Sequence, residues 1–104
     1  MGIFSFLFGN KTNQIQTYLD KGAIILDVRT QKEYNANHIE GAILIPVSEL
    51  DSRLKEVIDT DKPVIAHCAG GVRSAKAVSF LKSKGIDAIN GGGIARLKKN
   101  LDKS

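Results

Sequence analysis

The chain has 104 residues, of which 42% are hydrophobic and 25% are charged, and this suits one globular domain spanning residues 1–104. A single cysteine excludes an internal disulfide and any zinc site built on paired thiolates. The formal net charge of +4 is modest, and with four Phe, two Tyr and no Trp the chain lacks the aromatic residues of a base-stacking nucleic-acid surface. A mildly positive protein still favours small anionic substrates.

The first residues contain an apolar run, Ile3 to Phe8, that is far shorter than the roughly 20 residues needed to span a bilayer. The run lacks the basic start and the small-residue cleavage site of a secretory signal. Residues 1–9 are therefore expected either to fold onto the core of the domain or to dock on a partner or a membrane surface. A lone thiol without a signal predicts a cytoplasmic protein with no membrane span.

Helix signals recur along the chain between short apolar runs. Thr12 is the expected N-cap of a first helix that ends at Gly22, and Ser48 with Asp51 forms a candidate capping box for another. One helical turn is expected around residues 31–34, and longer helices over residues 74–84 and after the three glycines at 91–93. The side chains expected to face the core from these helices are Ile15, Tyr18, Leu19, Leu50, Leu54, Val57, Ile58, Ala77, Val78, Leu81, Ile94, Leu97 and Leu101.

Four apolar runs rich in branched residues are too short for helices and are typical of strands buried on both faces. They cover residues 23–28, 42–45, 63–67 and 86–90. Pro46 stops the second run, and Pro63 stands at the start of the third, where proline is tolerated. Because strands alternate with helices, the sequence predicts an α/β fold in which helices cover both faces of a parallel sheet.

The loop after the third strand carries the reactive residues, since ligands of such sheets bind beyond the carboxyl ends of the strands. Cys68 follows the strand, and Gly70 and Gly71 allow the backbone to curl and point successive amides inward. The start of the next helix adds free amides, and Arg73 adds a permanent cation. Such surroundings lower the pKa of a thiol from its usual value of about 8.5. Cys68 is therefore expected to be a thiolate nucleophile near neutral pH.

Cys68 and His67, which lie at this strand end, can each also be interpreted as structural residues. A lone cysteine is often a small, buried and inert core residue. His67 stands beside Cys68, but neighbouring strand residues point to opposite faces of a sheet. We therefore expect His67 to be a packed structural histidine and not the base of a Cys–His pair.

Two motifs together resemble the rhodanese domains, sulfurtransferases that carry sulfur as a persulfide on a cysteine. The first motif is Leu-Asp-Val-Arg at 26–29, Glu-Tyr at 33–34, His-Ile-Glu-Gly-Ala-Ile at 38–43 and Ile-Pro at 45–46. The second is Cys-Ala-Gly-Gly-Val-Arg-Ser at 68–74, followed by Asn-Gly-Gly-Gly at 90–93. The resemblance covers nearly all of the chain and implies a three-layer fold with a central parallel sheet of four to five strands.

The same resemblance implies a role for each matching residue. Cys68 is the catalytic nucleophile that carries the sulfur, Arg73 attracts the anionic donor, and the backbone amides of the loop hold the outer sulfur. The residues expected to bind the substrate are Ala69, Gly70, Gly71, Val72, Arg73 and Ser74. The residues expected to brace the structure around the site are Asp27, Arg29, Glu33 and His38.

Two other functions stay open from the sequence. The Cys68 and Arg73 pair resembles the signature of cysteine phosphatases. An arsenate reductase-like enzyme is a related alternative. Those enzymes place five residues between Cys and Arg, whereas this chain has four, and a tighter ring suits one extra sulfur atom better than a phosphate. A sulfur carrier or binding module that acts with a protein partner is the second alternative.

The sequence thus predicts a sulfurtransferase that takes sulfane sulfur from a small anionic donor such as thiosulfate. The acceptor is expected to be a thiol or a protein. We expect a monomer that uses no metal and no organic cofactor and binds no nucleic acid.

Overall fold

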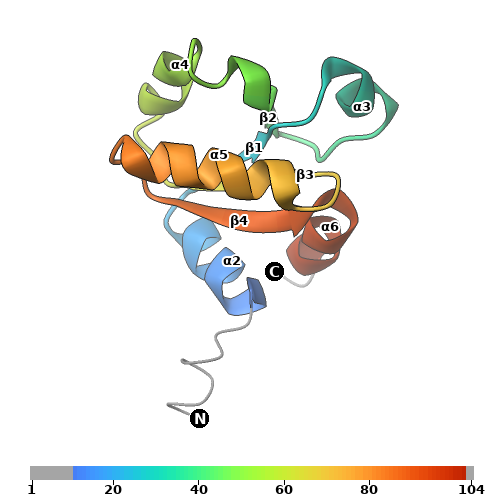
Figure 1. Cartoon of the computed structure of the whole chain (residues 1–104). Helices are drawn as coiled ribbons and strands as arrows, with labels where there is room; N and C mark the ends of the chain where they lie inside the picture. The colour runs from blue at the N-terminus through green and yellow to red at the C-terminus, as the bar shows by residue number, and fades with distance from the viewer. Residues whose placement is uncertain (1–10, 103–104) are drawn as a thin grey trace.

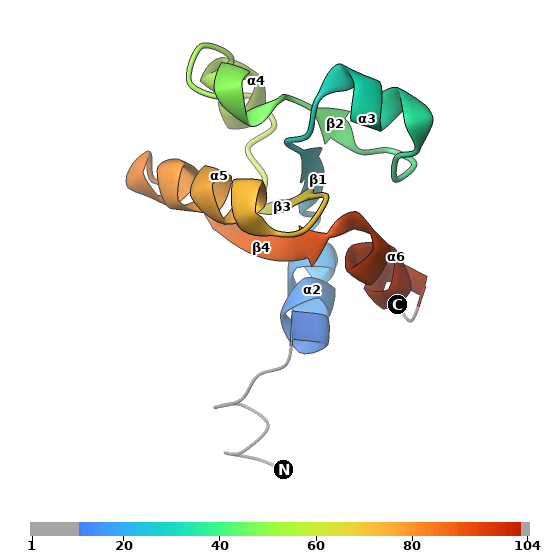
Figure 2. The ribbon, with the colours of Figure 1, turned by 45° about the vertical axis from the view of Figure 1, so that its right-hand side comes forward.

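The computed structural model describes residues 11–102, which form a four-stranded parallel sheet flanked by helices (Figure 1, Figure 2). The sheet has the order β2-β1-β3-β4, and every neighbouring pair is parallel. Its strands are β1 (Ile24–Asp27), β2 (Ile43–Leu44), β3 (Val64–Cys68) and β4 (Ala88–Gly93). The predicted α/β fold is confirmed, whereas the expectations for residues 1–9 lie outside the described residues.

Two apolar clusters fill the space between the sheet and the helices on its two faces. One cluster joins Val64 and Ala66 of β3 to α4 (Leu54–Ile58) and α5 (Val72–Ser83). The other joins Ile65 to α2 (Lys11–Asp20) and α6 (Ile94–Asp102). Because side chains alternate along a strand, consecutive residues of β3 supply opposite layers, and all five residues of β3 are buried. β3 therefore lies at the centre of a three-layer structure.

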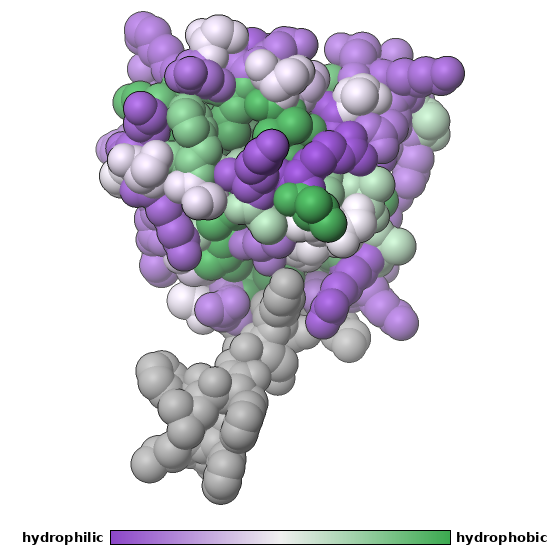
Figure 3. Space-filling model, in the orientation of Figure 1, coloured by the Kyte–Doolittle hydropathy of each residue, from purple (hydrophilic) through white to green (hydrophobic). Residues whose placement is uncertain are grey.

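The surface of the described chain is mixed in character. The face seen in Figure 3 carries charged and polar side chains with smaller apolar areas between them. Within residues 11–102, no helix combines the length and the apolar character needed to cross a membrane.

The predicted capping box at Ser48 is wrong. Ser48 lies inside a 3-10 turn, η1 (Val47–Glu49), and helix α4 begins only at Leu54. The turn follows Pro46 and carries Leu50 into the core, where it is 2% exposed, so tertiary packing outweighs the local helix signal. The shorter helix also leaves Ile58 53% exposed, and the expectation that it faces the core is wrong as well.

Other boundaries differ by a few residues. Helix α2 already begins at Lys11, so Thr12 lies in its first turn and is not the N-cap. Strand β4 continues past Asn90 through the three glycines, with Gly92 and Gly93 in register with the end of β3. A Cβ atom at Gly93 would lie 2.5 Å from the carbonyl oxygen of Ala69, so only glycine fits at this position. The glycine run is thus part of the sheet and brings β4 against the loop after β3.

Two buried polar side chains lie next to each other near the carboxyl ends of β1 and β3. Asp27 and His67 are both fully buried, and His67 Nε2 lies 3.7 Å from Asp27 Oδ2. Neither ring nitrogen of His67 has a hydrogen-bond partner within the described chain. Burial, the largest influence, lowers the pKa of His67, while the charge of Asp27 opposes the shift more weakly. His67 is therefore held as a neutral, packed imidazole.

This burial predicts that the protein loses stability in mild acid. The pKa of His67 is 6.5 in its unperturbed form and lower in the fold, so the unfolded chain binds the proton more readily. The free energy of unfolding should therefore fall by roughly 1 kcal/mol between about pH 7.5 and about pH 5.5, measured by urea denaturation. The fall should shrink in His67→Leu and persist in His38→Gln, which removes the other, exposed histidine. An identical pH dependence in His67→Leu and the parent would contradict the prediction.

Candidate active site

The residues between β3 and α5 form a tight loop around the sulfur of Cys68. Strand β3 ends at Cys68, and α5 begins at Val72, two residues earlier than the sequence predicts. Gly71 has a φ of 101°, a left-handed conformation that favours glycine. Its amide donates to Cys68 Sγ at 3.0 Å, and the amide of Ser74 donates to the same sulfur at 3.4 Å. The curled loop and the first turn of α5 thus aim backbone donors at one sulfur atom.

These contacts set the acidity of the thiol. Cys68 is 1% exposed, and burial, the largest single influence, raises its pKa. Hydrogen bonds from the side chain and amide of Ser74 and from the amides of Gly71 and Gly70 act in the opposite direction and together outweigh burial. The net effect is a pKa below the ordinary value for cysteine. Since hydrogen bonds to an ion are stronger than those to a neutral group, the loop favours the thiolate.

The loop rests directly on the glycine end of β4. A Cβ atom at Gly71 would lie 3.5 Å from Gly92 Cα, and one at Gly93 would collide with the carbonyl of Ala69. Backbone therefore packs on backbone at this point, which leaves the loop little room to move toward β4. The sequence predicts that these glycines lie between a strand and a helix. In the structure they belong to β4, and the loop packs on them.

Asn90 joins β4 to the loop, a role that sequence reasoning missed. Its Nδ2 donates to the carbonyl of Gly71 at 3.0 Å. Its Oδ1 accepts from Ser74 Oγ at 2.7 Å and from the amide of Gly92 at 2.8 Å. The available signal was a polar amide at the end of an otherwise apolar strand, next to three glycines.

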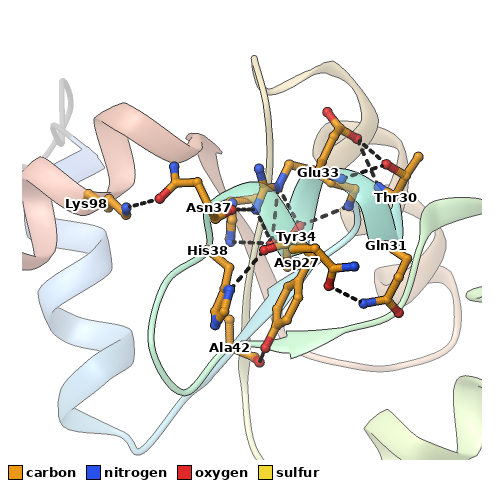
Figure 4. A network of polar contacts seen from close by, with 12 residues as sticks. Asp27, Thr30, Gln31, Glu33, Tyr34, Asn37, His38, Ala42 and Lys98 are labelled. Atoms are coloured by element: carbon orange, nitrogen blue, oxygen red, sulfur yellow. Dashed lines mark hydrogen bonds and ion pairs between the residues drawn. The ribbon is translucent and has the colours of Figure 1, made fainter.

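Arg73 has an internal partner in Glu33. Arg73 Nη1 and Nη2 donate to the two carboxylate oxygens of Glu33 at 2.7 and 2.9 Å. Glu33 lies in α3 (Gln31–Ala36), whose N-cap Thr30 forms a reciprocal capping box with it (Figure 4). The hydrogen bond from Arg73, followed by that from the Thr30 amide, lowers the pKa of Glu33 to about 2. The cation expected to attract the donor is thus paired with one of the residues expected to brace the site.

Asp27 and Arg29 form a second ion pair, which is almost fully buried. Arg29 Nε donates to Asp27 Oδ1 at 2.9 Å and Nη2 donates to Oδ2 at 2.7 Å. Arg29 Nη2 also donates to the carbonyl of Asn37 at 2.7 Å, which ties the end of β1 to the chain after α3. Removing either partner would leave a buried charge without compensation. This geometry is that of a structural brace.

His38 packs beside α3. Its ring stacks on Tyr34 with 3.9 Å between ring centroids, and its Nδ1 lies 2.9 Å from the carbonyl oxygen of Tyr34 (Figure 4). The contacts found in residues 11–102 link His38 to Tyr34 and not to Cys68. Of the four expected bracing residues, Glu33 contacts the loop region through Arg73, Asp27 and Arg29 contact each other, and His38 stays with α3.

A hollow of about 490 Å³ lies beside the loop, between it and the start of α6. Among its lining residues, Arg96 is the one charged side chain, and it is exposed and without an ion pair among the described residues. The Arg96 side chain runs alongside Gly92, because its Cδ is 3.7 Å from where a Cβ of Gly92 would lie. The lining residues are Ala69, Gly70, Gly71, Val72, Asn90, Gly92, Gly93, Ala95 and Arg96.

The described residues therefore bring together an acidic thiol, a set of amide donors and a free cation. Within residues 11–102, no group of three or more His, Cys, Asp or Glu side chains is placed to hold a metal ion. The arrangement suits a sulfur nucleophile that attacks or receives an anionic reagent.

Comparison with known proteins gives a consistent family. The rhodanese-like domain family matches residues 11–99. The Bacillus subtilis protein YqhL is 43% identical over 67 residues, covering 64% of this chain and 52% of that protein, so this chain spans about half the length of that relative. A rhodanese-like domain protein from Staphylococcus aureus has a similar structure, with a TM-score of 0.69, 36% identity and coverage of 83% and 86% of the two chains.

A human single-domain sulfurtransferase is also similar in structure, with a TM-score of 0.64 and 30% identity. The match covers 88% of this chain and 92% of the human one. Since the family match takes in nearly all of the described residues, the resemblance carried by the two sequence motifs is confirmed. The chain belongs to the rhodanese-like domain family.

Proposed function

We propose that this chain is a sulfurtransferase that moves a sulfane sulfur through a persulfide on Cys68. The observation that carries the proposal is the set of donors aimed at Cys68 Sγ from Gly71 and Ser74. Preorganised donors of this kind stabilise a sulfur anion before attack, and the same loop suits the anionic outer sulfur of a persulfide afterwards. Family membership and the likeness to a human single-domain sulfurtransferase support the proposal.

The proposed reaction has two displacement steps at sulfur. The Cys68 thiolate attacks the outer sulfur of thiosulfate, a bond forms between Sγ and that sulfur, and the sulfur–sulfur bond of the donor breaks. Its electron pair leaves with sulfite, and the negative charge of the enzyme moves to the outer sulfur of the persulfide. A thiol, an acceptor protein or, in a test, cyanide then attacks the outer sulfur and releases Cys68 as the thiolate. Both steps balance in atoms and electrons without a further reagent.

The phosphatase alternative requires Arg73 to hold a phosphate oxyanion over the thiolate. Instead, both terminal nitrogens of the Arg73 guanidinium donate hydrogen bonds to the carboxylate oxygens of Glu33. The four-residue spacing between Cys68 and Arg73 also makes a tight ring, with the Gly71 amide already 3.0 Å from the sulfur. These observations favour sulfur over phosphate. A purely binding module, the other alternative, does not need two backbone amides aimed at the sulfur of Cys68.

The cation that receives the anionic donor is the next part of the proposal. Arg73 is partly neutralised by Glu33, whereas Arg96 lines the hollow beside the loop without an ion pair in the described chain. We assign the first contact with the donor to Arg96, with Arg73 adding to the positive potential of the loop. A reducing compartment such as the cytoplasm suits this chemistry, because the lone thiol stays available there.

The nucleophile is tested by Cys68→Ser. Transfer of sulfur from thiosulfate to cyanide should fall to the rate without enzyme, because a serine hydroxyl is not ionised near neutral pH and cannot carry a persulfide. The thermal melting temperature should change little, which separates loss of chemistry from loss of fold. Turnover at the parent rate in Cys68→Ser would falsify the proposed mechanism.

The donor cation is tested by Arg96→Gln, with Lys99→Gln as a control that removes an exposed charge from the same helix away from the hollow. Arg96→Gln should raise KM for thiosulfate roughly two- to fivefold with little change in kcat, as expected for an exposed ion pair. The rise should be smaller for a monoanionic donor such as methanethiosulfonate and should shrink at high salt. Equal KM values in the two variants would remove Arg96 from the donor site.

Loop size is tested by inserting one glycine between Gly71 and Val72, which gives the phosphatase spacing. The inserted residue lengthens the chain between the Gly71 and Ser74 amides that donate to Cys68 Sγ, so sulfur transfer should fall steeply, while weak hydrolysis of an aryl phosphate appears. The parent protein should hydrolyse an aryl phosphate no faster than Cys68→Ser. Robust hydrolysis by the parent that depends on Cys68 would support the phosphatase function instead.

A further inference from the structure

The hydroxyl of Ser74 contacts two groups that compete for its proton. Ser74 Oγ lies 2.7 Å from Asn90 Oδ1 and 3.4 Å from Cys68 Sγ. A serine hydroxyl has one proton to donate. The amide oxygen of Asn90 has none, so Ser74 is the donor in the contact with Asn90. While that bond exists, the Ser74 hydroxyl cannot also donate to the sulfur, which then accepts only from the backbone amides of Gly71 and Ser74.

The orientation of the Asn90 amide is fixed by two backbone groups. The amide of Gly92 donates to Oδ1 at 2.8 Å, and Nδ2 donates to the carbonyl of Gly71 at 3.0 Å. A flipped amide would set Nδ2 against the N–H of Gly92 and Oδ1 against the carbonyl of Gly71. Asn90 therefore presents an oxygen, and not an N–H, to the Ser74 hydroxyl.

We propose that Asn90 is a positioning residue that competes with the Cys68 thiolate for the Ser74 hydroxyl proton. In the thiol state the proton lies on the Ser74–Asn90 bond. When Cys68 ionises, the hydroxyl turns its proton toward the sulfur, while the Gly92 amide keeps Asn90 Oδ1 partly satisfied. Asn90 thus keeps the ionised fraction of Cys68 smaller than the loop would give without it.

The exchange fits the proposed persulfide cycle, and this part alone rests on the proposed function. In the thiolate, the negative charge sits on Sγ, and Ser74 donates to it. Once the persulfide forms, the charge moves to the outer sulfur, and Sγ becomes a neutral, weakly accepting atom. The Ser74 proton then returns to Asn90 Oδ1, so the hydroxyl changes partner at each transfer.

Other charged and titratable groups near the sulfur do not change when Asn90 is substituted. They are His67 on β3, Asp27 at the end of β1, Arg29 after β1, Glu33 on α3, Arg73 on α5 and Arg96 on α6. His67 is kept neutral by burial, and the other groups near the loop form the ion pairs described above, apart from Arg96. A difference between Asn90 variants therefore reports on the contacts of residue 90 with Ser74, Gly71 and Gly92 and on any charge introduced there.

The test measures the pKa of Cys68 from the pH dependence of alkylation by iodoacetamide. The chain has one cysteine, so the rate reports on this thiol alone, and no sulfur donor is involved. Asn90→Leu removes the competing acceptor and should lower the pKa of Cys68 by about half a unit to one unit. Asn90→Asp strengthens the competitor and adds a negative charge, so it should raise the pKa by about one unit or more.

Opposite shifts distinguish this role from a structural one. If Asn90 only held the loop, both substitutions would weaken the Gly71 contact with the sulfur and raise the pKa of Cys68. In a Ser74→Ala background the lowering by Asn90→Leu should disappear, and the rise caused by Asn90→Asp should be smaller, because only its charge still acts. Shifts in the same direction, or effects that do not depend on Ser74, would overturn the proposal. If Asn90→Leu does not fold, the comparison of Asn90→Asp in the two backgrounds decides alone.

These measurements separate the two proposals. Absence of sulfur transfer with the predicted pKa shifts would contradict the sulfurtransferase function and leave the role of Asn90 intact. Sulfur transfer without the predicted shifts in the pKa of Cys68 would support the sulfurtransferase function and contradict the role of Asn90.

Discussion

The hydrogen bond from the Gly71 amide to the Cys68 sulfur is the interaction on which the site depends. It requires Gly71 to adopt a left-handed conformation and the loop to lie against the backbone of Gly92 and Gly93. A side chain at Gly93 would push Ala69 away and with it the donors aimed at the sulfur. The positive φ at Gly71 and the close backbone approach at Gly93 thus explain why the chain has glycine on both sides of this contact.

The charged side chains around the loop differ in their burial. Asp27 and Arg29 are buried together and fix the end of β1 to the chain after α3. Arg73 and Glu33 are partly exposed and join the first turn of α5 to the capping box of α3. Arg96 lies outside these pairs, at the hollow. Of these charged residues, Arg96 is the one without an ion pair among the described residues.

The sequence was sufficient for the elements whose signals are local and consistent with packing. The four strands were predictable because runs such as Ile24 to Asp27 are buried between two helical layers, and the reactive loop was predictable because glycines follow a cysteine at a strand end. The capping box at Ser48 failed, since burial of Leu50 imposes a 3-10 turn on a sequence with a helix-start signal.

Partners distant in the sequence could not be predicted. Glu33 and Arg73 are 40 residues apart, and Ser74 and Asn90 are 16 apart, so neither contact leaves a trace in local spacing. The glycines at 91–93 were expected only to follow the fourth strand, and their pairing with β3 shows that they extend the sheet. The position of the loop after β3 was thus predictable from the sequence, whereas its contacts with distant residues are visible only in the fold.

The central claim is that the loop stabilises a sulfur anion bound to Cys68. The most direct test is the intact-protein mass after incubation with thiosulfate and removal of the excess reagent. We predict the addition of one sulfur atom, located on Cys68 by peptide mapping and lost on treatment with cyanide. An unchanged mass under conditions where Cys68 is alkylated by iodoacetamide would contradict the claim, because a reactive thiolate would then be present without forming the persulfide.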